Sequence, residues 1–212
     1  MRTLSALARC GALALTLLLI GLQGAAAAQN HIILSLGDSL SAAYGLQPEQ
    51  GWVALLQQRL RSQGYEYQII NASVSGETTE GGLARLPRAL ALHHPGIVII
   101  ELGGNDGLRA LPVDQMRANL AQMAALCTAA GARVLLLGMQ IPPNYGPEYT
   151  QQFRSSYGSV AREKNLPLVP FLLNGVALNP QLMQADGIHP NELGQPKLLD
   201  NVWPALKPLL GK

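Results

Sequence analysis

Short apolar runs rich in β-branched residues recur along the chain and alternate with longer amphipathic segments. These runs predict strands at residues 31–36, 67–70, 97–102, 134–137 and 168–171. In the strongest run, 97–102, apolar residues follow one another with almost no alternation. Strands of that kind are typical of a parallel sheet that is covered on both faces.

Between the runs, apolar side chains recur at helical spacing and predict helices. The expected helices are one that carries Trp52, Leu55, Leu56 and Leu60 and ends at Gly64, one over 79–92, one from Asp114 to Gly131, and one over 151–164. Pro87 must kink or interrupt the second helix, because proline lacks the N–H that closes a helical turn. After Asn191, prolines at 196, 204 and 208 predict a broken helix.

This alternation of strands and helices predicts an α/β fold, with a doubly wound and mostly parallel sheet joined by right-handed crossovers. In such sheets, sites form outside the carboxyl ends of the strands. The position of each reactive side chain relative to a predicted strand therefore matters more than its identity alone.

Residues 1–28 have the pattern of a secretory signal peptide rather than of a folded element. Arg2 and Arg9 give a basic start, residues 12–22 are apolar, and small residues at 25–28 supply a cleavage point near Ala28. We expect export to the periplasm or the medium, which leaves one domain at 29–212; the alternative is a retained N-terminal anchor. No other segment predicts stable membrane insertion.

The charge balance changes once the leader is removed. The chain has 15 Lys and Arg against 13 Asp and Glu, and Arg2 and Arg9 lie in the leader, so the mature part is neutral. This argues against nucleic acid or an anionic membrane surface as a partner. Only Cys127 remains after residue 28, which excludes an intramolecular disulfide. We expect a monomer that acts on a small molecule.

A serine, a histidine and an acid each follow a predicted strand. Ser39, in the run Gly-Asp-Ser-Leu-Ser at 37–41, follows the first strand, and Asp186 and His189 follow the fifth. Together they are the groups that make a hydroxyl attack a carbonyl carbon. The alternatives are that Ser39 and Asp38 cap a following helix, and that Asp186 and His189 form a turn and a cap. Asp38 is the nearer acid, but neighbouring side chains diverge, so we expect it to be structural.

Three groups are expected to donate hydrogen bonds to an oxyanion beside the serine: the backbone N–H groups of Ser39 and Gly76, and the side-chain amide of Asn105. Gly76 follows the second strand and Asn105 the third. Each of these also has an ordinary interpretation as a turn residue. No metal site is expected, because no His, Cys or carboxylate has ligand spacing, and no glycine-rich nucleotide motif or Gly-x-Ser-x-Gly elbow occurs. No cofactor is expected.

Four blocks in order resemble the SGNH (GDSL) hydrolase family: 37–41, Ser-Gly at 75–76, Gly-Gly-Asn-Asp at 103–106 and Asp-Gly-Ile-His-Pro at 186–190. The resemblance implies a three-layer, flavodoxin-like α/β/α fold with a five-stranded parallel sheet of order 2-1-3-4-5. It also implies Ser39 as nucleophile, His189 as base, Asp186 as its orienting acid, and Ser39, Gly76 and Asn105 as the oxyanion hole. Expected acyl-chain contacts are Leu108, Leu111, Met139, Ile141 and Tyr145.

The predicted activity is that of a serine hydrolase that cleaves fatty-acyl esters and thioesters, such as lysophospholipids and acyl-CoA-type thioesters, through a covalent ester on Ser39. The alternatives are a carbohydrate O-deacetylase or an arylesterase on the same scaffold, and a non-catalytic lipid carrier. A carrier needs none of Ser39, Asp186 and His189, so their presence disfavours it. A deacetylase needs an open polar cleft with exposed aromatic residues, and aromatic residues make up only 5% of the chain.

Overall fold

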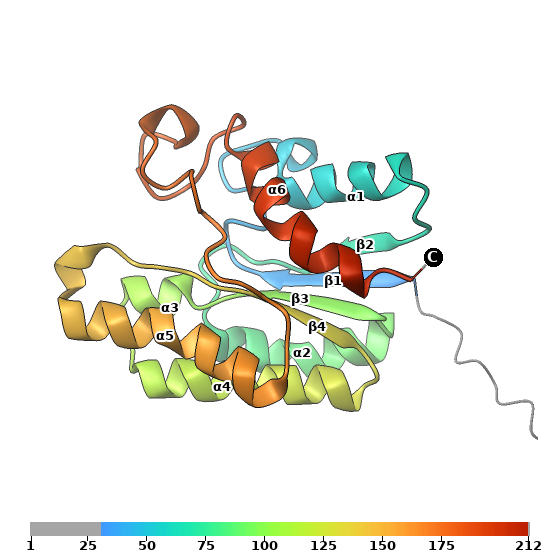
Figure 1. Ribbon diagram of the computed structural model, residues 1–212, viewed down its shortest axis with the longest axis horizontal. Coiled ribbons are helices and arrows are strands. Elements are labelled where there is room, and N and C mark those ends of the chain that lie inside the picture. The colour runs from blue at the N-terminus through green and yellow to red at the C-terminus, as the bar shows by residue number, and fades with distance from the viewer. Residues whose placement is uncertain (1–30, 212) are drawn as a thin grey trace, which may run out of the picture.

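Parallel strands form the central sheet, in the order β2-β1-β3-β4-β5 (Figure 1). The computed structural model describes residues 31–211, so the leader predicted at 1–28 lies outside the described residues. The strands are β1 (Ile32–Gly37), β2 (Gln68–Asn71), β3 (Ile97–Glu101), β4 (Arg133–Leu137) and β5 (Leu168–Val169). The predicted parallel sheet and its strand order are confirmed.

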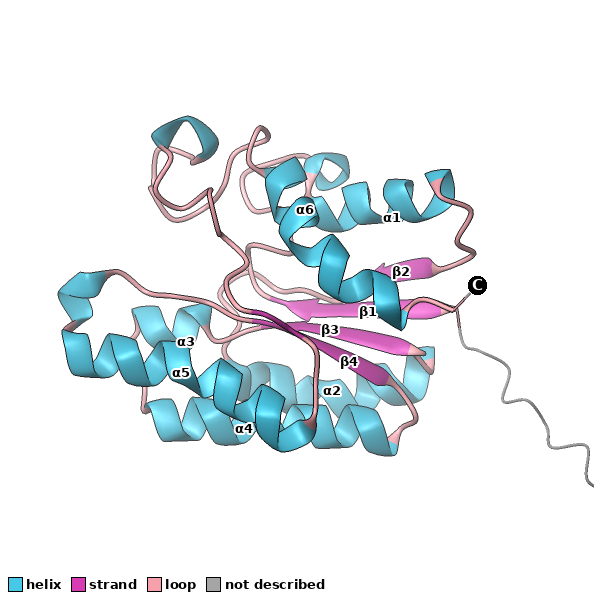
Figure 2. Ribbon diagram, viewed as in Figure 1, coloured by secondary structure: helices cyan, strands magenta, loops and turns pink. Residues whose placement is uncertain are grey.

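Two layers of helices cover the sheet (Figure 2). On one face α1 (Trp52–Ser62) packs against α6 (Gln195–Leu206), and on the other α4 (Val113–Ala129) packs between α2 (Thr79–His93) and α5 (Pro147–Lys164). The short helix α3 (Gly104–Leu108) follows β3 directly. This arrangement confirms the predicted three-layer architecture. Within residues 31–211, no helix has the length and apolar character needed to cross a membrane.

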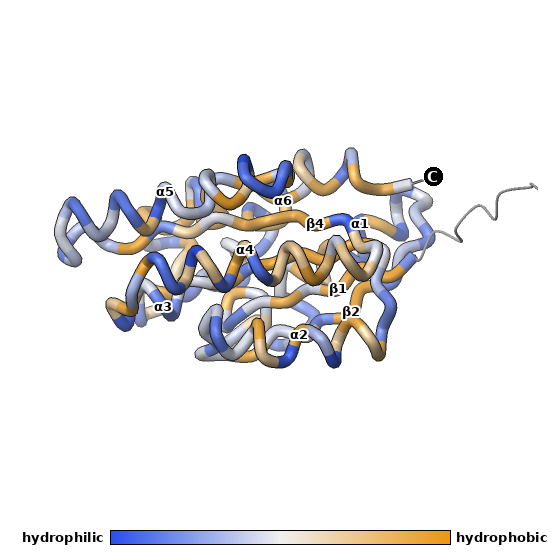
Figure 3. Tube along the Cα trace, turned by 90° about the horizontal axis from the view of Figure 1, so that it is seen from below, coloured by the Kyte–Doolittle hydropathy of each residue, from blue (hydrophilic) through white to orange (hydrophobic). Residues whose placement is uncertain are grey.

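The core lies on both sides of the sheet. All of β3 is buried, as are four of the five residues of β4, because helices cover both faces. Figure 3 shows the strands coloured mainly as hydrophobic, while the helices mix hydrophobic and hydrophilic positions. Glu101, the last residue of β3, departs from this chemistry because it is a fully buried carboxyl.

Prolines account for the main departures from the predicted elements. The broken helix expected after residue 191 was wrong for 195–206, where α6 is continuous. Pro196 lies in its first turn, where backbone N–H groups have no partner within the helix, and Pro204 removes one hydrogen bond near the other end. Only Pro208 falls in a separate short turn, η4 (Lys207–Leu209). Helix α2 continues through Pro87 without interruption.

The end of β5 and the start of α5 moved by two residues or more. β5 ends at Val169 rather than at 171, because Pro170 has no N–H to extend the ladder with β4. Helix α5 begins at Pro147 rather than at 151, and a proline is well suited to the first turn of a helix.

Candidate active site

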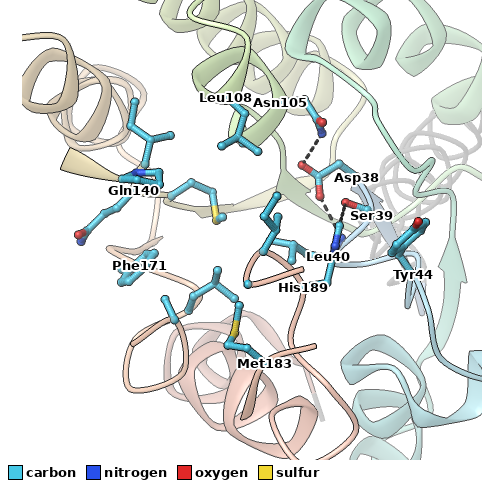
Figure 4. A pocket seen from close by; sticks show the side chains of 18 of the residues that line it. Asp38, Ser39, Leu40, Tyr44, Asn105, Leu108, Gln140, Phe171, Met183 and His189 are labelled. Carbon is cyan, nitrogen blue, oxygen red and sulfur yellow. Dashed lines mark hydrogen bonds between the residues drawn. The ribbon is translucent and has the colours of Figure 1, made fainter. Parts of the chain in front are cut away.

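Loops at the carboxyl ends of the strands bring the predicted residues together. Ser39, Gly76, Asn105 and His189 all lie on the wall of one cavity (Figure 4). Asp186 is not on that wall, but its carboxylate contacts the ring nitrogen of His189 that faces away from Ser39. The topology therefore gathers side chains that lie up to 150 positions apart in the sequence.

The segment that carries Ser39 is a series of turns and not the start of a helix, so the alternative that Asp38 and Ser39 cap a following helix was wrong. The first helical residues after β1 belong to the short turn η1 (Pro48–Gln50) and to α1. Ala43 and Gly45 take left-handed conformations, with φ of 58° and 75°, which no α-helix accommodates. Asp38 shapes the turn, because its Oδ1 accepts the N–H of Leu40 at 3.0 Å.

An unbroken chain of hydrogen bonds joins Asp186, His189 and Ser39. The Nε2 atom of His189 lies 2.9 Å from the Ser39 hydroxyl oxygen, and its Nδ1 lies 2.6 Å from Asp186 Oδ2. Burial alone would raise the pKa of Asp186, but hydrogen bonds from His189 and from the N–H of Ile188 outweigh it and lower that pKa to about 2. The carboxylate is therefore ionised at neutral pH, as a group that orients an imidazole needs to be.

The loop that holds the acid and the histidine is fixed by its own backbone. The other oxygen of Asp186 accepts the N–H groups of Ile188 and His189, and the N–H of Gln184 donates to the carbonyl of His189. Gly187 has a φ of +68°, the left-handed conformation that glycine adopts at little cost. The spacing of Asp186 and His189 thus follows from a tight turn, as the sequence suggested.

Two unpaired backbone N–H groups indicate an oxyanion site. Within residues 31–211, the N–H groups of Ser39 and Gly76 have no hydrogen-bond partner. Gly76 has a φ of +80°, and its loop is tied to the end of β1 because the N–H of Val74 donates to the carbonyl of Gly37. Free donors beside a reactive hydroxyl are the groups that bind a negatively charged oxygen.

The third expected donor, Asn105, lies in α3 and already has partners. Its side-chain nitrogen donates to Asp38 Oδ2 at 3.1 Å and to the carbonyl of Glu77 at 3.0 Å (Figure 4). These contacts hold the amide in one orientation at the wall of the cavity. An oxyanion would therefore share one of its N–H groups with an existing acceptor, a three-centre arrangement that is common in proteins.

The cavity beyond Ser39 has a volume of about 690 Å³ and is lined mainly by apolar side chains. Of the expected acyl-chain contacts, Leu108, Met139 and Ile141 line it, whereas Leu111 and Tyr145 are not on its wall. Leu111 is exposed, and the Tyr145 hydroxyl donates to the carbonyl of Leu108 at the end of α3. Tyr145 therefore adjoins the wall without forming it.

Much of the cavity wall comes from residues that the sequence did not single out. They are Tyr44, Phe171, Leu173, Leu178, Met183 and Ile188. Most of them lie between β5 and His189, in a segment with no regular apolar period, so no sequence pattern marked them. Tyr44 also contacts the His189 ring, with the ring centroids 4.6 Å apart. No group of His, Cys, Asp and Glu side chains in the described part of the chain is arranged to hold a metal ion.

The sequence profile of the GDSL-like lipase/acylhydrolase family matches residues 35–196. The chain belongs to this family. It is 56% identical over 205 residues to the esterase TesA of Pseudomonas aeruginosa. The aligned region covers 97% of this chain and 99% of the relative. It is 44% identical over 184 residues to the thioesterase 1/protease 1/lysophospholipase L1 of Escherichia coli, covering 87% of each.

A solved structure gives the same result for the fold. A crystal structure of TesA matches this GDSL hydrolase with a TM-score of 0.83 and 58% identity, over 84% of this chain and 99% of that one. The predicted family and reaction class, the hydrolysis of acyl esters, are confirmed.

Proposed function

We propose that this hydrolase cleaves fatty-acyl esters and thioesters through a covalent ester on Ser39. The observation that carries the proposal is the hydrogen-bonded chain from Asp186 through His189 to Ser39, at the wall of an apolar cavity of about 690 Å³. A carrier of lipids has no use for such a chain. A hydrolase needs both the chain and a place for the acyl group.

In the first half of the reaction, the Ser39 oxygen attacks the carbonyl carbon of the substrate while His189 Nε2 takes the hydroxyl proton. The negative charge that develops on the carbonyl oxygen is stabilised by the N–H groups of Ser39, Gly76 and Asn105. His189 then gives its proton to the leaving alkoxide or thiolate, and the acyl group remains on Ser39. Asp186 keeps Nδ1 protonated and stabilises the imidazolium.

In the second half, His189 takes a proton from water, and the resulting hydroxide attacks the acyl carbon of the Ser39 ester. The same three donors bind the oxyanion again. Breakdown of the tetrahedral intermediate returns the proton from His189 to the Ser39 oxygen, and the carboxylic acid leaves. Each oxyanion donor contributes about 3 kcal/mol to lowering such a barrier.

The cavity supports an apolar acyl group as substrate. Met139 and Leu173 are buried, and they line the same cavity as Phe171 and Met183 (Figure 4). An alkyl chain gains about 0.8 kcal/mol for each methylene that it buries there. Sugars would gain little from this wall, which disfavours the carbohydrate deacetylase. We further propose that the enzyme is exported, with cleavage near Ala28, and acts as a monomer.

The proposal is tested with p-nitrophenyl esters from C2 to C16 and with an acyl thioester. The mature enzyme is compared with Ser39→Ala and with Ser62→Ala, a matched control at the far end of α1. We expect kcat/KM to rise with chain length beyond C2 and to fall by at least about 10³-fold in Ser39→Ala alone. Activity that survives Ser39→Ala would overturn the proposal, and a sharp preference for acetate would favour the deacetylase.

A further inference from the structure

Glu101 is a carboxyl group in a place where the fold has no obvious need for one. It ends the strand β3, is fully buried, and pairs in register with Gly37, the last residue of β1. An alanine at position 37 would place its Cβ 2.7 Å from Glu101 Oε2, so the glycine before Asp38 leaves room for this carboxyl. The chain therefore keeps space for Glu101 beside the residue that precedes the nucleophile.

The contacts of Glu101 all go to the turn that carries Ser39. Its Oε2 accepts the Ser41 hydroxyl at 2.7 Å and the backbone N–H of Asp38 at 3.2 Å. Its Oε1 has no hydrogen-bond partner among the described residues. An ionised carboxylate with one oxygen unpaired in a dry interior is costly, and the neutral acid costs less to bury there.

The carboxyl of Asp38 connects this group to the candidate oxyanion hole. Its Oδ2 accepts the side-chain N–H of Asn105, and its Oδ1 accepts the N–H of Leu40. The remaining hydrogen of the Asn105 amide goes to the carbonyl of Glu77. The orientation of the Asn105 amide is thus set by two acceptors, of which Asp38 is held through its own N–H by Glu101.

The protonation of the pair agrees with these roles. Burial, followed by the charge of Asp38, raises the pKa of Glu101 well above its usual range, which favours the neutral acid. Burial also raises the pKa of Asp38, to about 6, against the hydrogen bonds from Leu40 and Asn105 that lower it. One negative charge, on Asp38, then faces the amide that it orients.

We propose that Glu101 is a positioning residue that holds Asp38, and through it the Asn105 amide, in the orientation that donates to the oxyanion. This inference rests on the proposed function, because it assigns Glu101 a part in that same site. Glu101 makes no hydrogen bond with Ser39 and does not itself line the cavity, whereas Asp38, whose N–H it accepts, does. Its effect must therefore pass through Asp38 and Asn105.

A double-mutant cycle tests this route. Glu101→Leu removes the acceptor for Asp38 and Ser41, whereas Glu101→Gln keeps an acceptor without an ionisable group. We expect Glu101→Leu to lower kcat about tenfold with KM within about twofold, as for the loss of a buried partner, and Glu101→Gln to keep kcat within about threefold of wild type. In an Asn105→Ala background, adding Glu101→Leu should lower kcat by less than about twofold, because the amide through which Glu101 acts has been removed.

Two controls separate positioning from general destabilisation. Cys127→Ala leaves a cavity under α4, away from the site, and should lower the thermal midpoint with kcat unchanged. If Glu101→Leu does not fold, Ser41→Ala removes one contact of the same carboxyl and replaces it in the cycle. We expect Ser41→Ala to lower kcat less than Glu101→Leu does. Its effect should likewise be smaller in the Asn105→Ala background than in the wild-type background.

The outcomes that overturn the proposal are distinct. Equal losses of kcat from Glu101→Leu with and without Asn105 would show that Glu101 does not act through the amide. A change in KM alone, or a loss of kcat in Glu101→Gln as large as in Glu101→Leu, would also refute it. Activity that survives Ser39→Ala would instead refute the proposed function, and this control is measured first.

Discussion

Replacing Asp186 by asparagine separates the catalytic role of this carboxylate from its role in the loop. Its Oδ1 accepts two backbone N–H groups, from Ile188 and His189, and an asparagine oxygen can accept both. Only the contact between Oδ2 and His189 Nδ1, 2.6 Å long, is lost. The amide that replaces Oδ2 is a donor, so it favours the histidine tautomer with the proton on Nε2, which cannot accept the proton of Ser39.

The expected loss follows from these contacts. A hydrogen bond to a charged group contributes about 1.5–3 kcal/mol, and the wrong tautomer of a buried triad costs about 10⁴-fold in kcat. The side chain of Asp186 is 37% exposed, and water weakens the effect of its charge. We therefore expect kcat to fall about 10²- to 10³-fold in Asp186→Asn, with KM and the unfolding midpoint close to wild type.

The assay is the steady-state hydrolysis of a p-nitrophenyl ester, with urea unfolding of each variant. Asp186→Ala serves as the comparison, because it loses the loop contacts as well and should be both inactive and less stable. A loss of less than about tenfold in Asp186→Asn, with the fold intact, would show that Asp186 does not orient His189. If kcat falls only in proportion to a fall in the unfolding midpoint, the catalytic role and the role in the loop are not separate.

Three further predictions concern stability and specificity. Burial raises the pKa of Asp38 from 3.8 to about 6. Between these two pH values the folded state binds more protons than the unfolded state, so the free energy of unfolding falls as the pH rises. The contribution of this carboxyl to that fall is about 3 kcal/mol. Measured by urea unfolding, the free energy of unfolding should fall less between about pH 4 and pH 7 for Asp38→Asn than for wild type. An identical fall in the two proteins would contradict the burial argument. Gly37→Ala places its Cβ 2.7 Å from Glu101 Oε2 and should lower the free energy of unfolding by about 1–3 kcal/mol in urea. The control Gly158→Ala lies inside α5 and should leave that free energy unchanged or raise it. Equal effects of the two substitutions would be inconsistent with this steric account. Ile141→Trp should lower kcat/KM for long acyl chains and spare acetate, and a uniform loss across chain lengths would place the acyl group elsewhere.

The fold was predictable because one physical feature repeats along the chain. Continuous apolar strands such as β3 indicate burial on both faces, and the intervening helical periods indicate the two covering layers. The errors in the helices at 79–93 and 195–206 arose because proline was given too much weight. Pro196 and Pro87 end no helix here, because a proline costs little in a first turn and because packing of a helix against the sheet outweighs one lost hydrogen bond.

The candidate site was predictable for residues that directly follow strands, and not for the rest. Ser39 and Asn105 lie just after β1 and β3, and His189 lies in the long loop after β5 at the same edge of the sheet. The wall formed by the 171–188 segment depends on an irregular loop, which no periodicity describes. A sequence signal for Glu101 did exist, since it is a single charge in an otherwise apolar strand.

The most direct test of the central claim is to locate the covalent bond that the mechanism requires. The mature enzyme is treated with an alkylphosphonate ester, whose tetrahedral phosphorus resembles the intermediate, and is then digested and analysed by peptide mass spectrometry. We predict one alkylphosphonyl group, on Ser39, which is absent from Ser39→Ala and forms far more slowly in His189→Ala. An adduct on another residue, or equal labelling of Ser39→Ala, would contradict the account.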